Sequence, residues 1–293
     1  MTESSFEPNF DAPEIPFPIE APFVMRADLS KLGSSIHGRI ESDHFRLDSD
    51  FLTYQKQKFE LLKSRAERCR CLQTNDPNGL RIALERTRDL FASEYPKFVP
   101  NIPESATLEE FADAVALVMQ EDFVIVQDSL EARAELIHVC FPSRWDPREK
   151  IGQSFAEVHM PVADSAALVK ASQSVARAMV TKGPFVRFVW ALTSNPKLDQ
   201  HPEMVWDEKN FSPEELVSRA FMRFERQTTY PMPDLERALF TIRVYMQPLT
   251  ETVNTPERRA RLGAAMRSMT SEVMRYKGSL GLYQAVLSWL EQH

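Results

Sequence analysis

The segment that decides the fold lies in the last third of the chain. It reads RAFMRFERQTT over Arg219–Thr229 and, after a loop at Pro231–Pro233, ALFTIRVYM over Ala238–Met246. Both runs are rich in aromatic and β-branched residues, which favour strands. The connection is short enough to join antiparallel neighbours. The sequence therefore predicts two long adjacent strands within an antiparallel sheet.

The first strand has two different faces, because side chains alternate along a strand. Phe221, Arg223 and Glu225 share one face. The other face begins with apolar residues and then presents Arg226. An arginine on a core-directed face needs a partner. Two interpretations stay open for Arg226: an ion pair with a nearby acid, or a cation directed into a ligand pocket.

Other segments complete an α+β pattern. Proline-rich residues 1–22 predict an extended arm, and residues 23–293 predict a single domain of one sheet covered on one face by helices. Thr107 and Glu110 form a capping box, and Asp164 is a predicted helix N-cap. Helices are expected at about 50–72, 79–94, 107–119, 164–181, 256–277 and 280–290, with a short one starting at 212. Further strands are expected at 123–127, 136–141, 155–160 and 185–192.

Composition excludes several classes of protein. The net charge of −7 argues against a broad nucleic-acid or anionic-membrane surface. No apolar run reaches the ~18 residues of a membrane helix, and the acidic, proline-rich start is unlike a signal peptide. Three cysteines cannot build a disulfide framework, which favours a cytoplasmic location. The eight glycines form no dinucleotide or P-loop motif, so electrons for redox chemistry would come from another protein.

His159 is the candidate metal ligand. It lies near the end of the predicted strand Phe155–Met160, two residues before Pro161. Neutral imidazole suits iron, and a haem iron needs only one protein ligand. A structural histidine is the alternative, and His138, on another predicted strand, is a competing candidate. No zinc-hydrolase spacing of histidines occurs.

Two long motifs and several short ones resemble a known family. The first motif is HVCFPSRWDPREKIG over His138–Gly152, continuing to VHMPV over Val158–Val162, and the second is FMRFERQT over Phe221–Thr228. Together they resemble the signatures of the haem-dependent oxidative N-demethylases. The pair Glu121–Asp122, the segment Arg187–Trp190 and the tripeptide Tyr276–Gly278 fit the same family, and the resemblance spans roughly residues 20–290.

The resemblance implies a fold, a cofactor and an activity. The fold would be PAS-like, with helical extensions around a small antiparallel sheet that holds haem b. His159 would ligate the iron, Trp190 would contact the cofactor, and Arg226 would be the cation of the distal pocket. The activity would be O2-dependent demethylation of a small secondary amine such as dimethylamine, with release of formaldehyde. NADPH electrons would arrive through a separate reductase that carries FMN and a 2Fe-2S cluster.

Departures from the family pattern bear on the substrate. Val189 stands where an asparagine is expected, and Thr229–Pro233 replaces a more usual Leu-x-Arg-Leu-Pro. Two other functions stay open: a haem-based PAS-type gas or redox sensor without turnover, and a cofactor-free subunit that retains the fold. No kinase motif, DNA-binding helix pair or terminal coiled coil indicates a sensor output.

Overall fold

The centre of the protein is a seven-stranded sheet with antiparallel neighbours. In the computed structural model, which describes residues 10–25, 27–128, 130–160, 166–208 and 210–292, the strand order is β1-β7-β8-β9-β5-β6-β4. The strands are β1 (Ser30–Lys31), β4 (Arg70–Leu72), β5 (Asp122–Gln127), β6 (Arg133–His138), β7 (Phe185–Thr193), β8 (Phe221–Met232) and β9 (Arg237–Pro248). A separate hairpin joins β2 (Ser35–Ile36) to β3 (Arg39–Ile40). The predicted α+β class is confirmed, while the PAS-like relationship and the division at residue 22 stay predictions.

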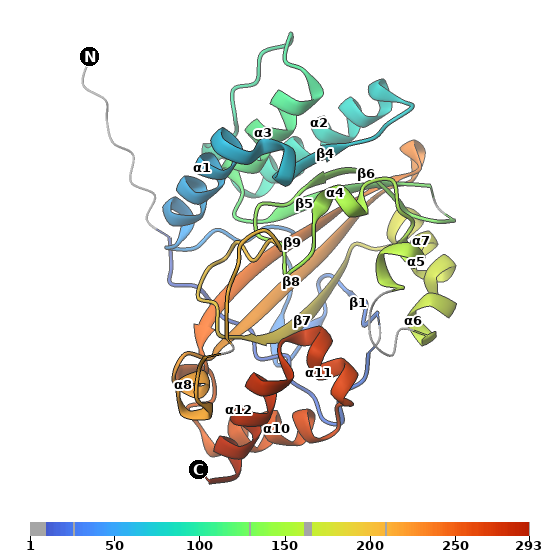
Figure 1. Cartoon of the computed structure of the whole chain (residues 1–293). Helices are drawn as coiled ribbons and strands as arrows, with labels where there is room; N and C mark the ends of the chain where they lie inside the picture. Colours follow the sequence, from blue (N-terminus) through green and yellow to red (C-terminus); the bar gives the residue numbers. More distant parts are fainter. Residues whose placement is uncertain (1–9, 26, 129, 161–165, 209, 293) are drawn as a thin grey trace, which may run out of the picture.

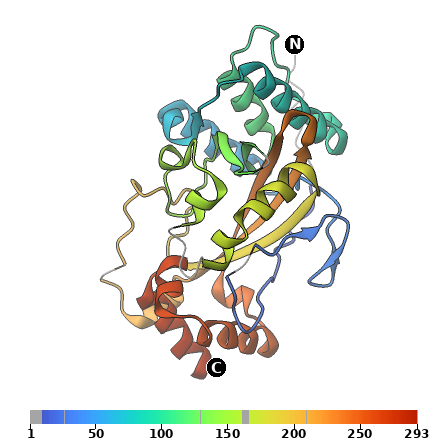
Figure 2. The ribbon, with the colours of Figure 1, turned by 90° about the vertical axis from the view of Figure 1, so that its right-hand side faces the viewer.

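Helices pack on both faces of this sheet, so the prediction of cover on one face alone was wrong. They are α1 (Phe51–Cys69), α2 (Pro77–Glu94), α3 (Leu108–Val118), α4 (Pro147–Lys150), α5 (Phe155–His159), α6 (Ala166–Lys170), α7 (Ser172–Thr181), α8 (Pro213–Ser218), α9 (Leu249–Thr252), α10 (Pro256–Arg267), α11 (Ser271–Lys277) and α12 (Leu280–Gln292). Short 3-10 turns occur at Pro96–Phe98 and Pro233–Leu235. Figure 1 shows α1–α3 at one end of the molecule and α10–α12 at the other, and Figure 2 shows α7 lying over the sheet.

The two faces have separate cores. On one face, Ile242 and Val244 of β9 pack with Val175 of α7, and we call this the α7 face. On the other, Phe224 of β8 packs with α10 and α12, and we call this the α10 face. A third cluster joins α2 and α3 to the far end of the α10 face. Residues paired across a ladder share a face of the sheet. The register of β7 with β8 therefore shows, for each side chain of these strands, whether it lies on the α7 face or on the α10 face.

Most of the predicted elements are confirmed, and their caps explain where they begin. Thr107 and Glu110 form the expected capping box of α3. Helix α8 begins near the expected position, with a capping box formed by Ser212 and Glu215. The long central strands form the longest ladder of the sheet; β8 begins two residues after its predicted start and ends three residues later, and β9 extends slightly beyond both predicted ends. Residues 10–22 contain no helix or strand, as expected for that part of the arm.

Several segments differ from the predictions. The described part of the predicted helix over 164–181 is two helices, α6 and α7, and the end of the predicted helix over 50–72 is strand β4. Phe155–His159 is helix α5, not a strand, because Ser154 and Glu157 form a capping box and only Val158 is β-branched. The predicted helix over 256–277 is two helices, since the Thr270 side chain caps a new start for α11. The predicted N-cap Asp164 lies outside the described residues.

Candidate active site

The motifs singled out in the sequence meet on the α7 face of β8. Ser143, from the loop after β6, donates a hydrogen bond to Glu225 Oε1 (2.7 Å) and accepts one from Arg223 Nε (2.6 Å). Arg223 also donates to the carbonyl oxygens of Phe141 and Leu198. The segment that carries Ser143 and the strand that carries Glu225 therefore form one hydrogen-bonded unit, although about eighty residues separate them.

Arg144 ties the same loop to the C-terminal helices. Its guanidinium donates to the carbonyl oxygens of Gly278 (2.6 Å) and Tyr276 (2.8 Å). Gly278 is needed at this junction, because a Cβ there would lie 2.8 Å from the Leu192 carbonyl oxygen and 2.6 Å from the Tyr283 ring. The Tyr276–Gly278 tripeptide is thus fixed against strand β7.

His159 ends α5 near the α7 face. Its Nδ1 lies 2.7 Å from the carbonyl oxygen of Phe155, and its ring packs on the Phe155 ring with centroids 4.1 Å apart. A carbonyl can only accept, so Nδ1 holds the proton and Nε2 holds the lone pair. The pKa of His159 is lowered to about 4, mainly by burial and also by the positive charges of Arg187 and Lys150, while the hydrogen bond to Phe155 raises it.

This arrangement fits the chemistry of a haem ligand. Metal-binding histidines usually donate their second ring N–H to a carbonyl or carboxylate, which fixes the tautomer and the ring orientation. No hydrogen bond joins His159 Nε2 to another described residue. An imidazole with so low a pKa stays neutral near pH 7. Residues 161–165, which begin two positions after His159, lie outside the described part of the chain.

Arg187 is a cation without a partner in the same region. It is on the α7 face of β7, opposite Gln227 in the ladder. Its Nε is buried without a hydrogen-bond partner, and no ion pair joins it to another described residue. Burial lowers the pKa of Arg187, while the charges of Asp28 and Glu225 raise it. An unpaired guanidinium of this kind is suited to meet a negatively charged ligand.

Arg226 lies on the opposite face and is fully occupied. Its Nε donates to Glu41 Oε2 (2.8 Å), and its terminal nitrogens donate to the carbonyl oxygens of Asp43 and His44. The side chain is 1% exposed. Of the two interpretations made from the sequence, these contacts support the ion pair. The structure does not bring Arg226 together with His159, because the sheet lies between them.

Trp190 is also on the α10 face. It is buried in the core with Phe224, packs edge-to-face on Phe23, and its ring centroid lies 5.0 Å from Lys277 Nζ. The competing candidate His138 is a structural residue: its Nε2 is 3.0 Å from Asp113, and its ring stacks on Phe123. The structure therefore groups His159 with Arg187 and Glu225 and separates it from Trp190 and Arg226.

Sequence reasoning did not identify Arg187 or Glu225 as site residues, although both lie in the family motifs. Strand alternation alone gave Glu225 the correct face, but only the packing of α5 and α7 showed which face carries His159. Within the described residues, no group of three or more histidine, cysteine or acidic side chains is placed to hold a metal ion. No helix in the described part of the chain is long and apolar enough to cross a membrane.

A comparison with known protein families identifies the family to which the chain belongs. Residues 36–287 match the family described as haem-dependent oxidative N-demethylase, alpha subunit-like. The match covers most of the chain, including both long motifs and the C-terminal tripeptide. The chain therefore belongs to this family, whose description specifies a haem cofactor and an alpha subunit.

Proposed function

We propose that this chain is the haem-bearing subunit of an oxidative N-demethylase. The observation that carries the proposal is the neutral, oriented imidazole of His159 beside the unpaired Arg187, within the region that matches the family. His159 Nε2 would hold the iron. When bound, haem supplies a redox-active centre that activates O2 for attack on a carbon–hydrogen bond.

The substrate proposed is a small secondary amine such as dimethylamine. Amines of this kind are cations near neutral pH, so binding them calls for a carboxylate. Glu225 is on the α7 face, with one oxygen bound by Ser143 and the other by Gln227 Nε2 (2.8 Å). Those two hydrogen bonds fix the orientation of the Glu225 carboxylate. We assign Glu225 to orient the ammonium group.

The net reaction requires two electrons from outside the chain. One N-methyl carbon is hydroxylated, the C–N bond breaks, and formaldehyde and the demethylated amine leave together with water. The proposed source is a separate reductase that carries FMN and a 2Fe-2S cluster and oxidises NADPH. Arg187, which has no hydrogen-bond or ion-pair partner among the described residues, would provide positive charge that stabilises negative charge developing near His159, an effect worth about 3–4 kcal/mol for a single well-placed donor.

His159→Ala tests the proposal directly. The protein is expressed with haem supplied, and its visible spectrum and haem content are recorded. The variant is expected to lose most of its haem and to change the ferrous spectrum, whereas His37→Ala, an exposed histidine, should match the wild type. Equal haem retention and an unchanged spectrum in His159→Ala would remove His159 from the ligand role.

A turnover assay separates the enzyme from the sensor alternative. Formaldehyde release from dimethylamine in the presence of a reductase is expected, and Glu225→Gln should raise the KM for the amine about tenfold or more. Ligand binding to the haem with no formaldehyde would instead favour a sensor.

A further inference from the structure

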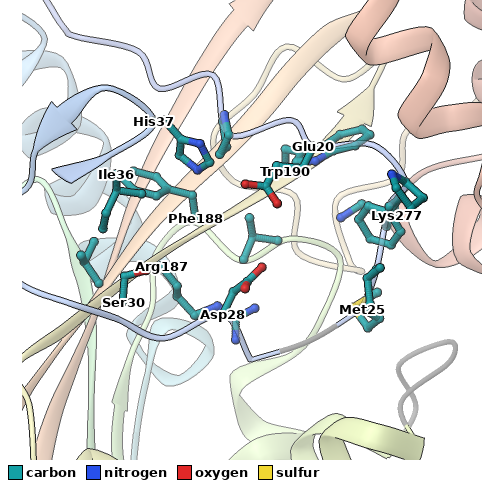
Figure 3. A pocket seen from close by; sticks show the side chains of 16 residues that line it. Glu20, Met25, Asp28, Ser30, Ile36, His37, Arg187, Phe188, Trp190 and Lys277 are labelled. Atoms are coloured by element: carbon teal, nitrogen blue, oxygen red, sulfur yellow. The ribbon is translucent and has the colours of Figure 1, made fainter. Parts of the chain in front are cut away.

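A small cavity lies at the free edge of β7, between that strand and the N-terminal segment 18–37. Its volume is about 140 Å³, and its walls include Phe23, Met25, Arg187, Phe188, Trp190 and Lys277. Figure 3 shows the aromatic side chains and Lys277 around it. His159 is not among the lining residues. Sites for drug-sized ligands usually measure about 300–1,000 Å³, so this cavity suits a molecule of only a few atoms.

The chemical group that distinguishes the cavity is the amine of Lys277. This residue is the last of α11 and is 5% exposed. Its Nζ lies 5.0 Å from the centroid of the Phe23 ring and 5.0 Å from that of Trp190. Those two rings are its only recorded partners among the described residues, since no hydrogen bond or ion pair reaches the amine.

The surroundings favour the uncharged amine. The pKa of Lys277 is lowered to about 7, mainly by burial; the charge of Glu225 raises it, and the charges of Arg187 and Arg144 lower it. Glu20 and Asp28, from the N-terminal segment, also line the cavity. Because a neutral amine carries a free lone pair, a buried lysine in this state is a nucleophile toward carbonyl carbon.

We propose that Lys277 forms a reversible imine with a small aldehyde in this cavity. The site stands on its own geometry, while the source of the aldehyde rests on the proposed function, which releases formaldehyde on the other side of the same strand. The Nζ lone pair attacks the aldehyde carbon to form a C–N bond, and the carbonyl oxygen takes up a proton. The nitrogen then expels that oxygen as water to give the C=N bond, so no oxidant or reductant is needed.

Reductive trapping tests the proposal on the full-length protein. Formaldehyde is added with cyanoborohydride, which delivers hydride to the imine carbon and leaves a methyl group on the nitrogen. Methylation of each lysine is followed by peptide mass spectrometry at neutral pH. Lys277 is expected to react at least about tenfold faster than the exposed Lys182, because a larger fraction of its amine is neutral. Reaction at Lys277 no faster than at Lys182 would overturn the proposal.

A second variant tests the cavity itself. Met25→Trp would fill the space beside Lys277 without altering the amine, and it is expected to slow labelling of Lys277 several-fold while leaving Lys182 unchanged. Unaltered labelling of Lys277 would show that the cavity is not where the aldehyde binds. The trapping experiment uses added formaldehyde and does not depend on turnover by the enzyme. A negative labelling result at Lys277 would therefore leave the proposed haem function intact. Likewise, evidence against His159 as the iron ligand would leave a positive labelling result intact.

Discussion

Charged side chains lie deep in this protein, and the partner of each determines its role. Arg223 and Arg226 are three residues apart on one strand and are almost fully buried. Arg223 fixes Ser143 and two carbonyl oxygens on the α7 face, whereas Arg226 holds the extended segment around Glu41 on the α10 face. Both therefore stabilise the fold, while Arg187 has no hydrogen bond or ion pair with another described residue.

Arg226→Met should destabilise the protein by about 3 kcal/mol, because it leaves the buried Glu41 carboxylate with only Arg46 as a cationic partner. The free energy of unfolding is measured by urea denaturation. Arg86→Met is the matched control: Arg86 pairs with Asp234 at the surface and should cost about 1 kcal/mol or less. Similar losses in the two variants would contradict the structural role given to Arg226.

Lys277 should make stability depend on pH. Its folded pKa of about 7 lies below the value of about 10.4 expected in the unfolded chain. Between those values the unfolded chain binds more protons, so stability rises with pH. Lys277→Met removes this contribution, and the wild type should gain stability relative to the variant from pH 7 to pH 10. A constant difference across that range would show that the amine is not shifted.

At the scale of elements, two short helices position the candidate residues: α5 positions His159, and α11 positions Lys277. Helix α5 has only five residues, and its capping box and the His159–Phe155 hydrogen bond fix the ring at its end. The end of α11 is fixed in another way, by the Arg144 hydrogen bonds and by close contact with β7. Packing, not helix length, holds both elements in place.

Gly278→Ala should destabilise the protein by about 1–3 kcal/mol, because the new methyl group would overlap the Leu192 carbonyl oxygen and the Tyr283 ring. Gly281→Ala is the control, since nothing lies within 4 Å of its added Cβ, and in a helix it should be neutral or stabilise by up to about 1 kcal/mol. Thermal unfolding measures both changes. Equal melting temperatures for the two variants would refute the close approach at Gly278.

At the scale of the whole molecule, the central sheet lies between two candidate sites, the proposed haem site and the Lys277 cavity. The α7 face carries His159 and Glu225, the free edge of β7 carries the Lys277 cavity, and Arg187 lies at the boundary of both. Arg144 links the loop after β6 to the C-terminal helices across this boundary. The arrangement couples the stability of distant segments.

Arg144→Met should lower the free energy of unfolding by about 1–2 kcal/mol, since it removes two hydrogen bonds from a charged donor. Hydrogen exchange should also increase in α11, more than one hundred residues away in sequence. Arg148→Met, which breaks ion pairs with Asp146 and Glu203, is the control and should leave α11 unchanged. Unaltered exchange in α11 of Arg144→Met would contradict the coupling.

The sequence alone determined the α+β class, the long β8–β9 pair, the capping box at Thr107, the helix start at Ser212, and the family, because these depend on local periodicity and on motifs. Strand alternation also placed Arg226 and Glu225 on opposite faces of β8. The helix α5 also has a local origin, the Ser154–Glu157 capping box that the strand prediction overlooked. Only the tertiary structure decided which face of the sheet His159 approaches. Alternation separates the two faces of a strand but carries no information about which helix will cover each one. That choice depends on packing between residues far apart in the chain, and it is what groups Arg187, and not Arg226, with His159.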